Sequence, residues 1–184
     1  AVDCRAKLRP DLCLLVMSAT MPGDVINEGE IPLVEIPGRS FDVDVGYRPR
    51  KRDVSLPYHV ARCVEEAMTS GPRGDVLVFL PGYAEINRTR EALGEEGCDA
   101  AICILHGTMG LDEQRRVLSP SDERRVILST NVAETSVTIP GVTAVVDSGL
   151  ERRVRFLPGT GMDHRDTVRI SAASASQRTG RAGR

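Results

Sequence analysis

Asp75–Leu80 reads DVLVFL, a nearly continuous apolar run. Such a strand is typical of a parallel sheet covered on both faces, because it leaves no face for polar side chains. Similar runs are LCLLVM at Leu12–Met17, AAICIL at Ala100–Leu105, RVILS at Arg125–Ser129 and VTAVV at Val142–Val146. Amphipathic stretches at Pro57–Ser70 and Tyr83–Glu96 lie between runs. This alternation predicts an α/β fold, a parallel sheet flanked by helices.

The last part of the chain has a different pattern. Arg152–Phe156 and Asp166–Ile170 are expected to pair as a β-hairpin around the Gly- and Pro-rich turn Leu157–Arg165, and Ser171–Arg184 is expected to be a loop followed by a helix. Residues 151–184 hold eight arginines against three acidic residues, a net charge of +5, although the whole chain has a formal charge of −2. A basic end of this kind favours a partner that carries phosphate.

Composition excludes several classes of protein. The chain of 184 residues is 41% hydrophobic and 27% charged, as in soluble globular proteins. No apolar run approaches the roughly 20 residues of a membrane-spanning helix, so an integral membrane protein is excluded. The five cysteines form no C-x-x-C pair and have no histidine at zinc-ligand spacing, so we expect reduced thiols in a cytoplasmic protein and no metal site.

Residues 20–52 are rich in proline and glycine and predict a linker with a domain boundary near residue 40. Residues 1–40 contain too few elements for a domain of their own, so we interpret them as the end of a preceding domain. Residues 41–184 form the main domain in this interpretation. Because no methionine stands at position 1, we expect the sequence to be part of a longer one.

The terminal string QRTGRAGR spans Gln177–Arg184. If the string is helical, Gln177, Arg181 and Arg184 lie on one face at i, i+4 and i+7. An amide and two guanidinium groups that converge on one spot suit a polyphosphate. A solvated basic tail is the alternative for a single R-x-G-R, but a full string of eight residues makes chance unlikely as an explanation.

This string resembles the last motif, QRxGRxGR, of the DEAH-box/RHA group of superfamily 2 helicases. Four further segments agree with that group in the expected order: SAT at Ser18–Thr20, LVFLPGYAEI at Leu77–Ile86, STNVAETSVTI at Ser129–Ile139 and VVDSGL at Val145–Leu150. The FLPG variant and the sequence of Phe156–Arg169 most resemble those of the bacterial HrpB-type members. The resemblance covers essentially the whole chain.

The resemblance implies an ATP-dependent RNA helicase with two RecA-like domains that face one another. Residues 1–40 are then the end of the first domain and residues 41–184 are the second, without its last strand and with a protruding β-hairpin. Neither the GxxxxGK[ST] phosphate loop nor DExH occurs in the sequence. ATP and Mg²⁺ are therefore expected in the intact protein, with the phosphate-loop and metal ligands outside this chain. The isolated chain is expected to be inactive.

The resemblance also implies roles for individual residues. Gln177, Arg181 and Arg184 would be catalytic and would contact the nucleotide, with the outer arginines as fingers, whereas Arg178 is a weaker candidate. Ser136 would sense the nucleotide, and Ser18 and Thr20 would couple hydrolysis to strand movement. Contacts to single-stranded RNA or another nucleic acid are expected from Pro81, Gly82, His106, Gly107, Thr130, Asn131, Thr135, Arg153 and Arg155.

Two alternatives remain. The Ser/Thr cluster of Ser129–Ile139 could simply be a turn and helix cap, and the chain could be a non-catalytic nucleic-acid-binding or interaction module with a RecA-like fold. A flavodoxin-like enzyme acting on a small molecule is disfavoured, because the sequence has neither a glycine-rich dinucleotide loop nor a paired acid–base constellation.

Overall fold

A computed structural model describes residues 42–135 and 138–182, together with Lys7, Arg9, Pro10, Asp11, Cys13, Leu15, Met17 and Val34. The chain divides into two compact units, Ala1–Gly38 and Arg39–Arg184, and the helices and strands described below belong to the second. The predicted strand at Leu12–Met17 lies largely outside the described residues. The assignment of residues 1–40 and 41–184 to two RecA-like domains stays a prediction.

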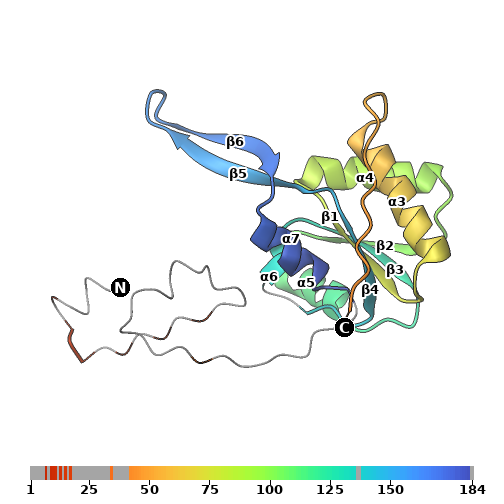
Figure 1. Ribbon diagram of the computed structural model, residues 1–184, viewed down its shortest axis with the longest axis horizontal. Helices are drawn as coiled ribbons and strands as arrows, with labels where there is room; N and C mark the ends of the chain where they lie inside the picture. Colours follow the sequence, from red (N-terminus) through yellow and green to blue (C-terminus); the bar gives the residue numbers. More distant parts are fainter. Residues whose placement is uncertain are drawn as a thin grey trace. The chain divides into compact units, whose positions relative to one another are not determined.

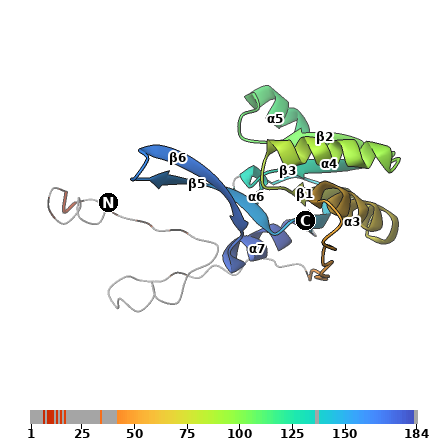
Figure 2. The ribbon, with the colours of Figure 1, turned by 90° about the horizontal axis from the view of Figure 1, so that it is seen from above.

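Among the described residues, four parallel strands form one sheet in the order β2-β3-β1-β4 (Figures 1 and 2). The strands are β1 (Asp75–Phe79), β2 (Ala101–Leu105), β3 (Arg125–Ser129) and β4 (Val142–Asp147). Every residue of the two central strands, β1 and β3, is buried, as their apolar runs predict. The outer strands β2 and β4 are only half-buried over most of their length. The predicted α/β class, a parallel sheet flanked by helices, is confirmed.

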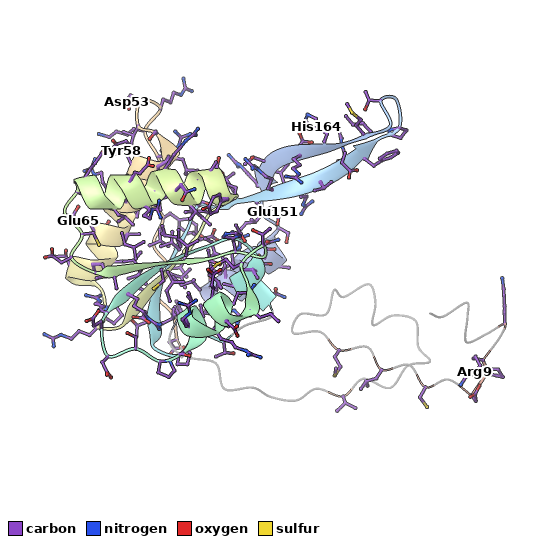
Figure 3. All side chains as sticks on the ribbon, turned by 180° about the vertical axis from the view of Figure 1, so that it is seen from behind. Arg9, Asp53, Tyr58, Glu65, Glu151 and His164 are labelled. Atoms are coloured by element: carbon purple, nitrogen blue, oxygen red, sulfur yellow. The ribbon has the colours of Figure 1, made fainter. Side chains whose placement is uncertain are left out.

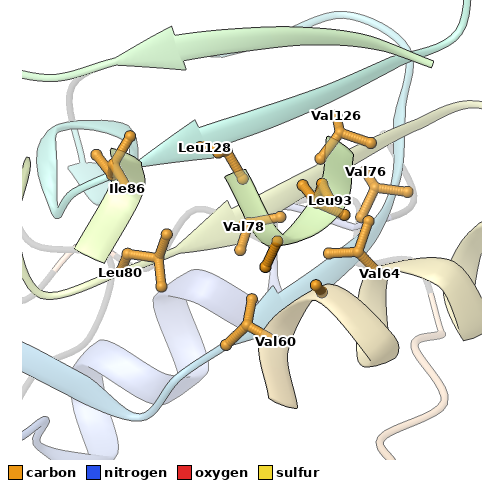
Figure 4. Close-up of a cluster of buried hydrophobic side chains, with 11 residues drawn as sticks. Val60, Val64, Val76, Val78, Leu80, Ile86, Leu93, Val126 and Leu128 are labelled. Carbon is orange, nitrogen blue, oxygen red and sulfur yellow. The ribbon is translucent and has the colours of Figure 1, made fainter. Parts of the chain in front are cut away.

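Helices cover both faces of this sheet. Alternate residues of the central strands point to opposite faces, because side chains alternate along a strand. On one face Val76, Val78 and Leu128 pack against α3 (Leu56–Ser70) and α4 (Tyr83–Glu95), in the cluster that Figure 4 shows. On the other face Leu77 and Ile127 pack with α5 (Leu111–Leu118) and α6 (Val132–Thr135). The sequence pattern does not predict α5.

The predicted hairpin is present and projects from the body of the domain (Figure 1). It consists of β5 (Leu150–Leu157) and β6 (Met162–Arg169), which pair antiparallel. The predicted turn, Leu157–Arg165, is too long, because the ladder continues to the pair Leu157 and Met162. The real turn is four residues long at positions 158–161, and Gly161 adopts a positive φ of 64° there. Helix α7 (Ala172–Thr179) follows the hairpin.

A buried ion pair closes the amino edge of the sheet. The Asp75 carboxylate, at the start of β1, accepts hydrogen bonds from Nε and Nη2 of Arg125 at 2.9 and 2.6 Å. Arg125 Nη1 also donates to the carbonyls of Val117 and Ser119, at the end of α5. The neighbouring Arg124 donates to the carbonyl of Met68 in the last turn of α3. These contacts tie β1, β3 and two helix ends together.

Four cysteines in the described part of the chain, Cys13, Cys63, Cys98 and Cys103, are free thiols. Burial raises the pKa of the Cys63 and Cys103 thiols above its ordinary value. Both therefore carry less of the reactive thiolate at neutral pH than an exposed cysteine does.

Two features are absent from the described residues. No helix among them is long and apolar enough to cross a membrane. Within the same residues, no three histidine, cysteine, aspartate or glutamate side chains lie together as a metal site requires.

We predict that Asp75→Asn lowers the free energy of unfolding by about 3–5 kcal/mol, because it leaves the buried Arg125 guanidinium without its counter-charge. Urea unfolding followed by circular dichroism measures this loss. The control is Asp99→Asn, which changes an exposed aspartate by the same substitution. Equal stability of the two variants would show that the pair does not hold this edge.

Candidate functional site

Three loops meet at the carboxyl edge of the sheet. Leu80 N donates to Ser129 O at 2.8 Å, and Thr130 N donates to Leu105 O at 3.3 Å. These bonds place the loops after β1, β3 and β2 side by side. The loops carry the predicted nucleic-acid contacts at Pro81-Gly82, Thr130-Asn131 and His106-Gly107. In open α/β sheets this edge is where ligands bind.

The three loops differ in how far they reach solvent. Gly107 and Asn131 are exposed, and His106 and Thr130 are half-buried. Pro81 and Gly82 are buried. A Cβ atom added to Gly82 would lie 3.1 Å from the guanidinium of Arg152, which reaches over this glycine from β5 and forms an ion pair with Glu85. Among the predicted contacts, the exposed ones therefore lie in the loops after β2 and β3.

Tyr83 is a residue at this edge that the sequence analysis missed. Its ring lies 4.8 Å from the ring of His106, measured between centroids, with the planes tilted by 60°. The side chain is 53% exposed, although an aromatic ring of this size is usually buried further. The backbone N–H of Thr108 donates to Nδ1 of His106 at 3.3 Å and so orients the imidazole. The signal in the sequence was the aromatic residue directly after FLPG.

Helix α7 presents the arginine motif next to these loops. Gln177 is half-buried in its last turns, and Arg181 is half-buried just beyond its end. The helix ends at Thr179, so Arg181 lies beyond it and does not continue the helical face of Gln177. Arg181 N and Ala182 N instead donate to the carbonyls of Arg178 and Thr179, the tighter i to i+3 pattern of a helix end. Arg184 lies outside the described residues.

Arg178 is the most buried charged residue of the site, with 1% of its surface exposed. Its Nε donates to Glu134 Oε2 and its Nη1 donates to Asp147 Oδ1, each at 2.9 Å. The guanidinium carbon lies 4.8 Å from the centroid of the Phe79 ring, in the geometry of a cation–π contact. Arg178 therefore binds protein on every side and holds α7 against β1, β4 and α6. Arg178 is the weaker finger candidate by sequence, and the roles of the motif arginines stay predictions.

Glu134 and Ser174 complete this network and were also missed. Ser174 Oγ donates to Glu134 Oε1 at 2.7 Å, and the Glu134 carbonyl accepts a hydrogen bond from Nη2 of Arg181. Glu134 thus contacts three residues of α7 and the turn after it. The only signal in the sequence was an acidic residue inside the Ser/Thr-rich segment.

The hairpin carries the remaining predicted contacts. Arg153 and Arg155 are exposed on the same face of β5, since they are two residues apart. Arg153 Nε donates to Glu151, and Arg155 lies opposite His164. Figure 3 shows Glu151 at the base of the hairpin and His164 farther along it. The other face carries Val154 and Phe156, which are about 60% exposed.

The side chains of several predicted site residues lie outside the described part of the structure. Ser18, Thr20 and Ser136 lie outside the described residues, as Arg184 does. Thr135 is the last residue of α6. Their predicted roles stay predictions.

A family model described as the helicase conserved C-terminal domain matches residues 59–184, well over half of the chain. The chain belongs to this helicase family. It is 43% identical to the ATP-dependent RNA helicase HrpB of Escherichia coli (strain K12), over 100% of this chain and 23% of that protein. It is 36% identical to an ATP-dependent RNA helicase HrpA homolog of Haemophilus influenzae, over 96% of this chain and 14% of that protein.

Solved structures give the same result for this helicase domain. It matches a crystal structure of the E. coli DExH-box NTPase HrpB with a TM-score of 0.86 and 42% identity, over 100% of this chain and 23% of that one. A second crystal structure, of the E. coli DEAH/RHA helicase HrpB, matches with the same TM-score. The predicted resemblance to HrpB-type DEAH/RHA helicases is confirmed. The chain spans less than a quarter of the length of these relatives.

We predict that Arg178→Met destabilises the helicase domain by about 3–5 kcal/mol, because Glu134 and Asp147 lose the cation that they share. The matched control is Arg155→Met on the exposed face of the hairpin, with a change of about 0.5 kcal/mol or less. Urea unfolding of both variants measures the difference. A fully stable Arg178→Met variant would contradict the structural role of this arginine.

Proposed function

We propose that this chain is the second RecA-like domain of an ATP-dependent RNA helicase of the DEAH type, which couples nucleoside triphosphate hydrolysis to translocation along, or unwinding of, nucleic acid. One observation carries the proposal: the arginine motif of α7 and the exposed loops after β2 and β3 lie at one edge of one sheet. The network of Glu134 and Arg178 joins them there. Family membership and the relatives' printed activity support the same assignment.

The donor groups of this chain fit a phosphate-bearing nucleotide. Gln177 contributes an amide, and Arg181 contributes a guanidinium whose orientation is fixed by the Glu134 carbonyl. Such donors match phosphate oxygens in charge and geometry. In the proposed enzyme Gln177, Arg181 and Arg184 face the terminal phosphate from the side opposite the phosphate loop, and Ser136 senses it. Arginines placed in this way neutralise charge that develops in phosphoryl transfer.

Mg²⁺ is assigned to the first RecA-like domain of the same protein. No cluster of carboxylates in the described residues fits a magnesium ion, whose usual protein ligands are carboxylate oxygens. Bound to the nucleotide, the ion would neutralise phosphate charge. The first domain would also supply the phosphate loop, so we expect residues 1–184 alone to hydrolyse no ATP. Ser18 and Thr20 would couple the two domains, and the free thiols fit a cytoplasmic enzyme.

Single-stranded RNA is the proposed nucleic-acid partner. The loops at His106-Gly107 and Thr130-Asn131 offer backbone and hydroxyl groups to its phosphates, and Thr135 at the end of α6 would join them. Pro81 and Gly82 would join the contact if Arg152 moves away from Gly82. The exposed Arg153 and Arg155 add charge along the hairpin. Contacts of this kind bind the backbone and carry no sequence information, as a translocating enzyme requires.

In the intact protein we expect Arg184→Ala to reduce ATP turnover by about 10³-fold or more, since an arginine finger contributes about that factor. RNA affinity is expected to stay within about twofold, because phosphate contacts to RNA come from other residues. Turnover and fluorescence anisotropy of a labelled oligonucleotide measure the two effects. Arg90→Ala, an exposed arginine of α4, is the matched control.

Equal loss of turnover and of RNA binding in Arg184→Ala would contradict the assignment of this arginine as a finger. A wild-type intact protein that binds RNA but hydrolyses no ATP would contradict the enzyme itself. It would support the alternative of a non-catalytic nucleic-acid-binding module with a RecA-like fold.

The proposed contact between the hairpin and RNA can be tested by the salt dependence of RNA affinity. Replacing Arg155 with alanine removes one cation near the RNA backbone, so the plot of log affinity against log salt concentration should become shallower by about 0.7. The expected loss of affinity is similar for different RNA sequences. Titrations in 50–200 mM KCl, with Arg90→Ala as control, measure the slope. An unchanged slope would place the RNA away from this face of the hairpin.

A further inference from the structure

Glu134 is the one residue of the described site whose side chain and backbone both hold α7. Its two carboxylate oxygens accept hydrogen bonds from Ser174 Oγ and Arg178 Nε, at 2.7 and 2.9 Å. Its carbonyl accepts the hydrogen bond of Arg181 Nη2. The three donors come from successive turns of α7 and from the turn after it. A displacement of Glu134 therefore moves the whole segment that carries Gln177 and Arg181.

The same residue belongs to the exposed loop after β3. Glu134 N donates to Asn131 O at 3.0 Å, and Ala133 N donates to Thr130 O at 3.4 Å. Helix α6 is four residues long, so one turn separates the exposed Asn131 from the buried Glu134 carboxylate. A ligand that shifts the backbone at Thr130 and Asn131 shifts Glu134 with it.

The other anchor of α7 is the parallel sheet. Arg178 is also bound to Asp147 at the end of β4 and lies over Phe79 at the end of β1. Both strands are part of the parallel sheet, with β1 at its centre. Helix α7 is thus held between a rigid sheet and a short turn that a ligand can reach.

We propose that Glu134 is a positioning residue that transmits nucleic-acid occupancy of the Thr130–Asn131 turn to Gln177 and Arg181. The inference rests on the proposed function, since it requires nucleic acid at the turn and nucleotide at the arginines. It adds the physical link between them. That link is a coupling free energy, so each ligand raises the affinity for the other by the same factor.

The test uses Ser174→Ala in the intact protein. This change removes one hydrogen bond to Glu134 and leaves its ion pair with Arg178 in place. We expect the ratio of ATP turnover with single-stranded oligo(U) to turnover without it to fall toward 1, because the segment that carries Gln177 and Arg181 loses one of its hydrogen bonds to Glu134. The matched control is Ser176→Ala on the exposed side of the same helix, which should keep the wild-type ratio.

A binding measurement tests the coupling between the nucleic-acid and nucleotide sites without ATP hydrolysis. The Kd of fluorescein-labelled oligo(U) is measured by anisotropy with and without a non-hydrolysable ATP analogue. In the wild type the analogue should tighten binding, and in Ser174→Ala this tightening should shrink toward no effect. Glu134→Asp should act in the same direction, because the shorter side chain keeps its charge but cannot reach Ser174 and Arg178 together. Thermal unfolding confirms that each variant is folded.

The outcomes are distinguishable. Equal fractional loss of stimulated and unstimulated turnover, with the effect of the analogue on Kd unchanged, would show that Glu134 only stabilises the fold and would overturn the inference. A Ser174→Ala variant that behaves like Ser176→Ala would also overturn it. A wild-type protein without nucleic-acid-stimulated turnover would overturn the proposed function first, and the inference with it.

Discussion

The buried guanidinium of Arg178 is the interaction on which the arrangement of this site depends. A charge in a protein interior is costly unless it is paired and fully hydrogen-bonded. Arg178 meets that condition only where Glu134, Asp147 and Phe79 come together. Helix α7 has eight residues and is too short to be stable by itself in water. Its position therefore depends on this side chain together with the hydrogen bonds that Ser174 and Arg181 donate to Glu134.

The two edges of the sheet use charge in different ways. At the amino edge, Asp75, Arg124 and Arg125 direct their polar groups into the protein and close the ends of α3 and α5. At the carboxyl edge, the buried Arg178 network lies beneath loops whose outer residues, Gly107 and Asn131, reach solvent. The amino edge therefore stabilises the fold, and the carboxyl edge combines stabilising contacts with groups free to meet a ligand.

Local pattern was enough to predict the central strands, because β1 and β3 are buried on both faces and their sequences are apolar throughout. It also predicted the hairpin but not the full length of its strands, since Met162, Asp163 and His164 have the composition of a loop, and only pairing with Leu157, Phe156 and Arg155 makes them a strand. The different roles of the motif arginines also depend on contacts with residues that are distant in sequence. Arg178 is distinguished from Arg181 by carboxylates that lie 44 and 31 residues earlier, and sequence spacing does not show those contacts.

Arg178 and Arg181 both form hydrogen bonds with Glu134, but with different atoms of it. Arg178 contacts the carboxylate, so its position depends on the identity of the side chain at residue 134. Arg181 contacts the carbonyl oxygen, which every residue provides, so its position depends on the path of the backbone. The backbone path is set in turn by the hydrogen bond from Glu134 N to Asn131 O. The geometry that presents Arg181 is therefore determined in the exposed turn after β3, and the chemistry of the arginine motif cannot be understood from the motif alone.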